Sequence, residues 1–495
     1  EDIDVAGRVE CVNPVTGEMI TSLPEAADAE IRDKIEKIKG SLPSWQALGL
    51  RERSRFITQV RKRLVSEMDR VIDTICDETG KPDFDGFIEI LVTCEIFRFV
   101  AREGPRALKP EKRSPGFLRS KRVWIHYLPY GGVAVISPWN YPLILTAGPI
   151  VQALMAGNGV ILKPSEYATL TALKLKEIFD RAGFPSGIFQ VVVGSGSVGE
   201  KVVEDRETRL ISFTGSIPVG KKIAVACAER LKPAILELGG KDPVIVLEDA
   251  NLDRAARAAV WGGFHNGGQT CISVERVFVV ESVAEDFIER LTGMARQIQV
   301  GADRFHSDVG SIIHQRQLDT VVAQVNDARN HGARVLVGGD PLPGLGGFFL
   351  EPTVVTGAQD TMEIMKEETF GPVIAVSTVK NAEEAMKRAN SGAYGLNASI
   401  FTEDRFKARQ MAERLEAGNI CINDVLTNYL CASLPFGGTK ESGIGRLQGL
   451  EGLRSFARTQ SVCEDWLGLK KEPWWFPVTD RAKQAFRSLV RIRYG

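Results

Sequence analysis

The chain has 495 residues, of which 62 are Lys or Arg and 63 are Asp or Glu, so its net charge is −1. With 44% hydrophobic and 25% charged residues its composition is that of a globular protein, and at about 100–200 residues per domain two to four folded units are expected. These values exclude a disordered acidic chain and a protein that is basic throughout, as general nucleic-acid binders often are.

The eight cysteines are dispersed, and none forms a CxxC pair or stands with histidines at the spacing of a zinc site. Dispersed cysteines in a chain of this length are typical of a reducing compartment, so we expect a cytoplasmic protein with no metal. The N-terminal stretch Glu1–Asp4 is acidic and does not resemble a secretory signal peptide.

Short apolar runs alternate with amphipathic stretches along most of the chain, which predicts an α/β fold with parallel sheets. The window Val123–Leu162 has no charged residue, but prolines and glycines interrupt it, so it predicts buried strands and turns rather than a membrane span. The predicted strands are Gly132–Ile136, Gly159–Leu162, Phe189–Val193, Leu210–Phe213, Ala234–Leu238, Pro243–Val246, Arg276–Val280, Ala333–Val337, Val373–Val379, Ala398–Phe401 and Asn419–Ile422. The predicted helices are Thr169–Ala182, Ser197–Val203, Val219–Ala228, Leu252–Trp261, Ala284–Met294, Arg316–Asn330, Ala382–Ala389 and Phe406–Leu415.

The first motif with chemical potential is Pro138-Trp139-Asn140-Tyr141-Pro142, directly after the predicted strand Gly132–Ile136. An Asn amide at a strand end can donate a hydrogen bond into an oxyanion hole. Taken alone, an Asn between two prolines is more often an Asx turn.

Three later turns are suited to a nucleotide. Lys163-Pro164-Ser165-Glu166 offers a cation and a carboxylate to ribose hydroxyls, and Phe213-Thr214-Gly215-Ser216 opens a helix whose N-terminus could hold a phosphate. Gly194–Gly199 matches G-x-G-x-x-G after a strand, but the acidic residue expected about 20 positions later is missing. Each of these turns, taken separately, is at least as often an ordinary loop.

Two further residues could carry out catalysis. Glu237, at the end of the predicted strand Ala234–Leu238, could be a general base, although an ion-paired Glu at a strand end is the commoner case. Cys271 follows the turn Gly267–Thr270 and could be a nucleophile, which requires a thiolate and is helped by positive local potential. A buried structural cysteine is the commoner alternative.

Together, these pieces resemble the aldehyde dehydrogenase superfamily over about residues 10–464, and they occur in the order that the superfamily has. The matching motifs are Pro138-Trp139-Asn140, Lys163-Pro164-Ser165-Glu166, Phe213-Thr214-Gly215-Ser216, Glu237-Leu238-Gly239-Gly240-Lys241, Gly268-Gln269-Thr270-Cys271, Glu367-Glu368-Thr369-Phe370-Gly371-Pro372 and Pro435-Phe436-Gly437-Gly438-Thr439-Lys440-Glu441-Ser442-Gly443.

The resemblance implies a non-acylating, NAD(P)-dependent enzyme. Cys271 attacks the aldehyde to give a thiohemiacetal, Asn140 and the Cys271 N–H stabilise the oxyanion, and loss of hydride gives a thioester that Glu237 hydrolyses through water. The resemblance also implies the cofactor-binding residues Ser137, Pro138, Trp139, Lys163, Ser165, Glu166, Gly196, Phe213, Thr214, Gly215, Ser216, Val219, Leu238, Gly239, Gln317, Glu368 and Phe370. The Glu166 carboxylate would accept hydrogen bonds from a ribose diol and repel a 2′-phosphate, so we expect NAD, with NADP less favoured.

The substrate is predicted from fewer residues. The implied substrate residues are Tyr141, Ile144, Leu145, Gly148 and Ile272. Gly148 leaves space that a bulky aromatic residue would fill, which favours medium- or long-chain or aromatic aldehydes, although the glycine could equally serve close helix packing. The entrance loop Asp424–Cys431 has no Lys or Arg for a substrate carboxylate, which argues against the alternative, succinate semialdehyde. A cysteine hydrolase without redox chemistry, and a non-catalytic relative, are the alternatives from other classes.

The implied architecture is a Rossmann-like NAD-binding domain at 1–107 and 129–239, an α/β catalytic domain at 240–440, and a small β oligomerisation element at 108–128 and 447–463 that builds a homodimer or homotetramer. Residues 466–495 depart from this pattern. They hold seven basic and two acidic residues and three of the seven Trp, with apolar residues at helical spacing after Thr479. Such a helix could lie on an anionic membrane surface or pack on a neighbouring subunit.

Overall fold

The computed structural model describes residues 7–495, so the acidic stretch Glu1–Asp4 lies outside the described residues. The chain divides into two compact units. The first unit runs to Leu108 and continues over Leu128–Arg458, and the second unit comprises Lys109–Tyr127 and Thr459–Gly495. The predicted domain boundaries remain predictions.

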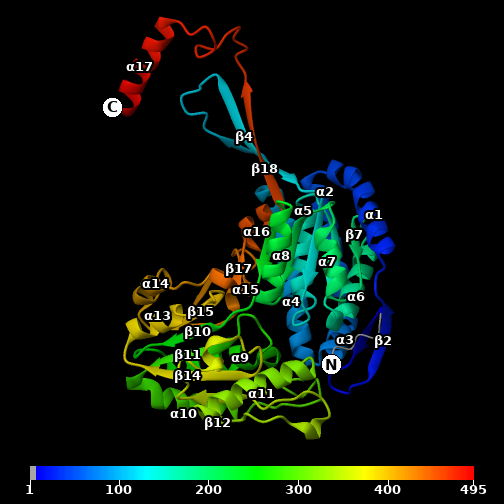
Figure 1. Ribbon diagram of the computed structural model, residues 1–495, viewed down its shortest axis with the longest axis vertical. Coiled ribbons are helices and arrows are strands. Elements are labelled where there is room, and N and C mark those ends of the chain that lie inside the picture. The colour runs from blue at the N-terminus through cyan, green and yellow to red at the C-terminus, as the bar shows by residue number, and fades with distance from the viewer. Residues whose placement is uncertain (1–6) are drawn as a thin grey trace. The chain divides into compact units, whose positions relative to one another are not determined.

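The first unit contains a six-stranded sheet with the order β17-β9-β8-β5-β6-β7 (Figure 1). All its pairings are parallel except that of β17 with β9. Its strands are β17 (Gly443–Ile444), β9 (Ala234–Glu237), β8 (Thr208–Thr214), β5 (Gly132–Ser137), β6 (Gly159–Pro164) and β7 (Phe189–Val191). The helices between and beside them are α1 (Asp28–Ala47), α5 (Ile144–Met155), η1 (Glu166–Ala168), α6 (Thr169–Arg181), α7 (Gly196–Glu204) and α8 (Ile217–Glu229).

Apolar periodicity explains how one face of this sheet is covered. Ile31, Ile35 and Ile38 lie on one side of α1, at the spacing of a helix face, and pack with Ile161 of β6 and Ile211 of β8 in one buried cluster. Before this core come β1 (Arg8–Val12) and β2 (Met19–Pro24), and after α1 come α2 (Leu50–Ser66), α3 (Met68–Thr79) and α4 (Asp83–Ala107).

The first unit also contains a seven-stranded sheet with the order β12-β13-β14-β11-β10-β15-β16, parallel except for the edge pair β12 and β13. Its strands are β12 (Arg334–Val337), β13 (Thr353–Thr356), β14 (Val373–Val379), β11 (Val274–Val280), β10 (Asp242–Val246), β15 (Asn397–Phe401) and β16 (Asn419–Ile422). The helices from here on along the chain are α9 (Leu252–Phe264), η2 (His265–Gly268), η3 (Glu281–Val283), α10 (Ala284–Ala295), α11 (Gln315–Asn330), η4 (Pro343–Leu345), α12 (Glu363–Lys366), α13 (Ala382–Asn390), α14 (Arg405–Ala412), α15 (Thr427–Leu430), η5 (Lys440–Ser442) and α16 (Gly449–Ser455), the last of which packs on α4 and α5.

Helices cover both faces of this second sheet, because successive residues of its strands point to opposite sides. Val277 of β11 packs in the cluster with α9 and α10, whereas Phe278 packs in the cluster with α11, α13 and α14. The predicted α/β fold with parallel sheets is therefore confirmed.

Several predicted boundaries differ from the observed ones, most by one to three residues, as where α9 ends at Phe264 and not at Trp261, and two of the differences have a clear cause. The helix predicted to end at Leu415 ends at Ala412. Leu415 lies beyond the helix and is apolar because its side chain is buried, not because it continues the helix. The strand predicted near 447–463 begins at Ala457, and α16 takes up the residues before it, with Leu453 and Phe456 buried at helical spacing.

The second unit is a small three-stranded sheet, β18-β4-β3, followed by one helix. Its elements are β3 (Glu111–Arg113), β4 (Lys121–Pro129), β18 (Ala457–Asp465) and α17 (Asp480–Tyr494), of which β4 and β18 continue into the first unit. The Thr479 hydroxyl accepts a hydrogen bond from the Ala482 N–H and caps α17, as predicted. Within residues 7–495, no helix is both long and apolar enough to cross a membrane.

Candidate active site

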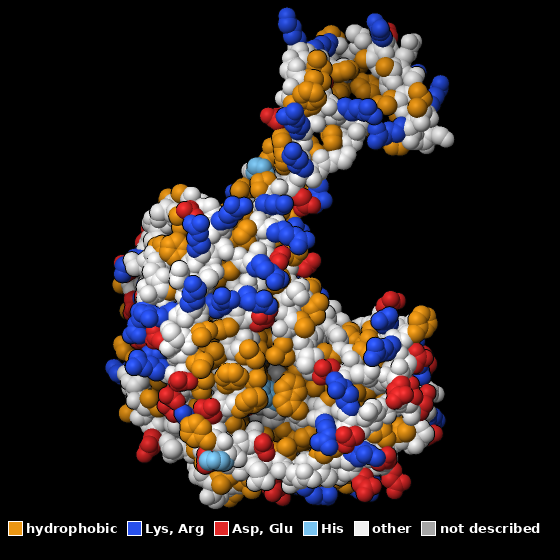
Figure 2. Space-filling model, turned by 180° about the vertical axis from the view of Figure 1, so that it is seen from behind, with side chains coloured by type: hydrophobic (Ala, Val, Ile, Leu, Met, Phe, Trp, Pro, Cys, Tyr) orange, Lys and Arg blue, Asp and Glu red, His pale blue; other side chains and the backbone are white. Residues whose placement is uncertain are grey.

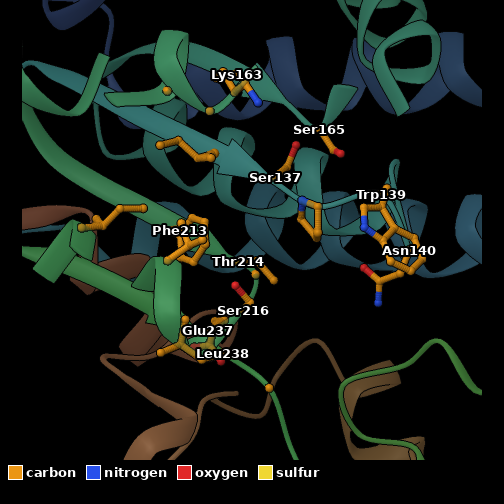
Figure 3. A pocket seen from close by; sticks show the side chains of 18 of the residues that line it. Ser137, Trp139, Asn140, Lys163, Ser165, Phe213, Thr214, Ser216, Glu237 and Leu238 are labelled. Carbon is orange, nitrogen blue, oxygen red and sulfur yellow. The ribbon is translucent and has the colours of Figure 1, made fainter. Parts of the chain in front are cut away.

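A cavity of about 860 Å³ opens in the first unit beside the carboxyl ends of β5, β6, β8 and β9. All the residues predicted as catalytic and all those predicted to bind the cofactor line this cavity. Figure 3 shows Lys163 and Ser165 on one side of it and Glu237 and Leu238 on the other, with Thr214 and Ser216 between them. The ends of parallel strands meet at one edge, which is why motifs far apart in sequence converge here.

Cys271 reaches the cavity because the chain turns sharply after α9. Asn266 and Gly267 have φ values of 55° and 65°, which lie in the left-handed region of backbone conformation. Gly and Asn adopt this conformation more readily than other residues. Burial raises the pKa of the Cys271 thiol well above 9.0, and the carboxyl groups of Glu368, Asp242 and Glu237 raise it further. These neighbours therefore supply no positive potential that would help to form the thiolate.

Glu237 ends β9 with its side chain buried at 4% exposure. Neither carboxyl oxygen has a hydrogen-bond partner among the described residues. Burial raises the pKa of Glu237 well above 4.5, while Arg446 lowers it. Buried carboxyl groups without partners are rare, and a raised pKa of this kind is typical of groups that exchange protons.

Asn140 follows β5 and is 4% exposed. Its side-chain amide donates one hydrogen bond to the Gln269 carbonyl at 3.0 Å, two residues before Cys271. A carboxamide has two N–H donors, so one remains for a ligand oxygen.

The N-terminus of α8 is suited to a phosphate. Ser216 is its N-cap residue but makes no side-chain capping bond, and Gly215, Ser216 and Val219 line the cavity. Uncapped N–H groups at a helix N-terminus attract anions. Beside β6, the Lys163 ammonium lies 3.3 Å from the Glu166 carboxylate, so a cation and an acceptor stand together as a ribose would require.

A buried hydrogen-bond network supports the backbone of the segment that carries Glu368 and Phe370. The Glu275 carboxylate accepts hydrogen bonds from the Thr369 and Phe370 N–H groups and pairs with Lys241. Phe370 has a φ of 52° and lies edge-on to Trp139 at 5.4 Å.

The glycines of the Glu237–Lys241 motif permit this close approach. A Cβ on Gly239 would collide with the Glu368 carboxylate, and the Gly240 N–H donates to that carboxylate at 3.1 Å. The donors, the uncapped helix and the ribose-type pair together fit a dinucleotide.

Gly196 and Gly199 of the G-x-G-x-x-G stretch line the cavity, and Gly196 begins α7. Gln317 donates to the carbonyls of Thr369 and Phe370, both at 3.0 Å. Gln317, which the resemblance implies as a cofactor-binding residue, also lines the cavity.

The five predicted substrate residues are not brought to the cavity. Ile144, Leu145, Gly148 and Ile272 are buried, and the Tyr141 hydroxyl is bonded to Thr270 at 2.7 Å. A Cβ on Gly148 would meet only Ile96, at 3.8 Å, so close helix packing does not require glycine at this position.

The sequence reasoning missed His314 and Arg316, which line the cavity. The His314 ring accepts a hydrogen bond from the Gln317 N–H at 3.0 Å and caps α11, and burial lowers the pKa of the ring. A polar residue three positions before a Gln at the start of a helix is a capping signal that could have identified it. Within residues 7–495, no group of His, Cys, Asp and Glu side chains could hold a metal ion.

A family model, related sequences and solved structures all place the chain among the same proteins. The model of the aldehyde dehydrogenase family matches residues 3–462. A 4,4'-diapolycopene aldehyde oxidase of Methylomonas sp is 37% identical over 490 residues, covering 98% of this chain and 91% of that protein. A protein of Mycobacterium tuberculosis (strain H37Rv), provisionally named as a succinate-semialdehyde dehydrogenase of the NADP(+) type, is 35% identical and covers 96% and 92%.

Solved structures agree. An NAD-dependent aldehyde dehydrogenase from Sinorhizobium meliloti has a TM-score of 0.90 at 32% identity, over 94% of this chain and 93% of that one. An NAD+ complex of an aldehyde dehydrogenase from Bacillus cereus has a TM-score of 0.89 at 32% identity, over 93% of both chains.

Proposed function

The chain belongs to the aldehyde dehydrogenase family, and from that premise we propose that it oxidises an aldehyde to the free carboxylic acid through a covalent intermediate on Cys271. The observation that carries this proposal is the convergence of Cys271, Glu237 and Asn140 on one cavity with the dinucleotide-type cradle.

The chain's own residues divide the chemistry between them. The Cys271 thiol gives up its proton to water, the thiolate attacks the aldehyde carbon, and the Asn140 amide and the Cys271 N–H donate to the oxygen that becomes negative. A bound nicotinamide would supply the acceptor for the hydride that leaves the carbon. Glu237 then takes a proton from water, the resulting hydroxide attacks the thioester carbon, and the carbon–sulfur bond breaks to give the free acid and the Cys271 thiolate.

The cofactor proposed is NAD. Lys163 and Glu166 would hold the adenosine ribose, the α8 N-terminus the pyrophosphate, and Glu368 the nicotinamide ribose. The Glu166 carboxylate would repel a 2′-phosphate, although relatives named for NADP(+) exist. A kinetic preference for NADP in the purified protein would contradict this choice.

NADH absorbance with a panel of aldehydes tests the activity directly. We expect NADH and acid in equal amounts with the wild-type protein, and no NADH with Cys271→Ala, which should still bind NAD. Release of acid from an ester, with no NADH formed from any aldehyde, would instead indicate a cysteine hydrolase.

We propose that the substrate is a medium- or long-chain or aromatic aldehyde. One relative is named a 4,4'-diapolycopene aldehyde oxidase, and the loop 424–431 offers no Lys or Arg to a substrate carboxylate. The kcat/KM of hexanal and of benzaldehyde should exceed that of acetaldehyde, whereas equal values for all three would count against this substrate class.

Succinate semialdehyde is the second candidate, because several relatives carry that name. Its carboxylate would need a cation near the loop 424–431, and Arg254 beside this loop already lies 3.7 Å from Asp424. Turnover of succinate semialdehyde at or above that of hexanal would reverse this ranking.

We also propose that the second unit binds an anionic lipid surface. It carries 13 Lys and Arg against five Asp and Glu, a net charge of +8. Ten of the 25 exposed large apolar side chains of the described chain belong to it, including Phe476 at 92% and Ile492 at 85% exposure. Basic and apolar side chains lie next to one another on its surface in Figure 2, as in peripheral membrane proteins.

Vesicle co-sedimentation tests the lipid surface. Full-length protein should sediment with vesicles containing phosphatidylserine and be released by salt, whereas residues 1–464 should stay in solution. Equal behaviour of the two proteins would refute the proposal.

Assembly into a homodimer or homotetramer is proposed from β18, whose side chains from Arg458 to Asp465 are mostly exposed and which forms one edge of its sheet. Exposed edge strands are ready to pair. Light scattering after gel filtration should give a mass of two or four chains.

A further inference from the structure

We propose that Lys81 is a positioning residue for Asn140: held by the Glu89 carboxylate, its ammonium fixes the Asn140 carbonyl, so that the Asn140 amide stays directed at the substrate oxygen. This inference rests on the proposed function of Asn140.

Lys81 and Glu89 form an ion pair at the centre of the first unit. Lys81 lies between α3 and α4, Glu89 lies on α4, and their side chains are 2% and 0% exposed with 2.7 Å between charged atoms. Removing two charges from water is energetically costly, and an exposed pair avoids that cost. The location of this pair therefore calls for an explanation.

The ammonium has a second acceptor that supplies one. Lys81 Nζ lies 2.8 Å from the Asn140 carbonyl oxygen and 4.6 Å from the centre of the Tyr141 ring. A charged donor makes a stronger and better directed hydrogen bond than a neutral one. The backbone of the proposed oxyanion residue is thus bound by a fixed cation.

Glu89 holds the other end of the same short segment. Its second oxygen accepts hydrogen bonds from the Leu143 N–H at 2.9 Å and the Ile144 N–H at 3.2 Å, at the start of α5. Pro142, which precedes Leu143, has no backbone N–H to donate. One ion pair therefore secures the segment from its carbonyl at Asn140 to its amides at Ile144.

Asn266 connects this segment to the cysteine loop, the stretch 265–271 that ends at Cys271. Its side-chain amide donates to the Asn140 carbonyl at 3.0 Å and to the Gln269 carbonyl at 3.2 Å, and Gln269 also accepts from the Asn140 amide. The position of Asn140 relative to the cysteine loop is consequently fixed by the groups that meet at these two carbonyls.

A double-mutant cycle tests the inference. Lys81→Met/Glu89→Gln removes both charges and should lower kcat about 10- to 100-fold while changing NAD affinity little, since removing an oxyanion donor outright costs about 10²- to 10³-fold and these changes only release its backbone. In an Asn140→Ala background, the same change should lower kcat by less than about twofold, because the residue through which it acts is gone.

Asn266→Gly is the second variant, for the case in which the charge variant does not fold. Glycine readily adopts the φ of 55° at this position, and the substitution leaves no buried charge without its partner. Its loss of kcat should also disappear in the Asn140→Ala background.

Arg53→Met is the matched control. Arg53 is a buried cation that donates to the Met155 carbonyl at 2.9 Å, at the opposite end of α5. It should lower the melting temperature and leave kcat within about twofold.

Unchanged kcat in the Lys81 and Asn266 variants, or an equal loss with and without Asn140, would overturn the inference. Absence of NADH formation by the wild-type protein would instead mean that the proposed function had failed.

Discussion

Glu237 is the residue whose surroundings most directly set a measurable rate. Because burial raises its pKa and no described group bonds to either oxygen, a larger share of Glu237 is protonated at a given pH than of an exposed glutamate, and as the proposed base it is activated as pH rises. The steady-state rate should therefore increase with pH through this pKa. Glu237→Gln should keep the first burst of NADH but slow later turnovers by about 10²- to 10⁴-fold, and a rapid-quench experiment separates the two.

Glu368 gives a prediction about stability. Burial raises its pKa to about 8, with the Glu275 charge adding to the effect. The unfolded chain ionises this group near pH 4.5, so its stabilising contribution is complete below that pH and is lost as pH rises to about 8. In urea unfolding without cofactor, the wild-type protein should lose stability relative to Glu368→Gln over this interval. A constant difference would contradict it.

The proposed catalytic residues could be located from sequence, whereas the residues that support them could not. Cys271, Glu237 and Asn140 each follow a recognisable strand or turn, so local pattern marks them. Lys81 and Asn266 reach the Asn140 carbonyl from 59 and 126 positions away, and no local pattern carries that information.

At the scale of the element, two helical glycines should respond in opposite ways to alanine. In α5, a Cβ on Gly148 would be in ordinary contact with Ile96, so Gly148→Ala should raise the free energy of unfolding by about 0.5–1 kcal/mol. In α9, a Cβ on Gly262 would lie 2.7 Å from Val274, so Gly262→Ala should lower it by about 1–3 kcal/mol. Denaturant titration of both variants checks the pair, and destabilisation by Gly148→Ala would show that α5 is packed more tightly there.

Strands were easier to predict than the first helices. The buried parallel strands are short β-branched runs, such as Val133–Ile136, that have few alternatives. The sequence reasoning named none of α1 to α4, whose burial depends on elements later in the chain, since α4 packs on α5 and α3 packs on α6. Tertiary packing decides these helices.

At the scale of the whole molecule, charge is divided unequally. The net charge of −1 contains a second unit of +8, so the remainder carries −9. The sequence reasoning found the basic tail but not the six basic residues that the hairpin 109–127 adds, because only folding assembles the two segments into one unit. The protein should bind both cation and anion exchangers at neutral pH, and residues 1–464 should bind the cation exchanger more weakly. Equal retention of the two proteins would contradict this.

The apolar and basic surface of the second unit bears on where the enzyme would find its substrate. Each methylene of an alkanal favours transfer out of water by about 0.8 kcal/mol, or roughly fourfold in partitioning, so a long aldehyde resides almost wholly in lipid. A freely diffusing enzyme would sample only the small dissolved fraction. An enzyme held at the bilayer searches in two dimensions, at the interface where the reservoir lies, so its apparent KM would depend on the surface concentration of aldehyde rather than on its amount per volume.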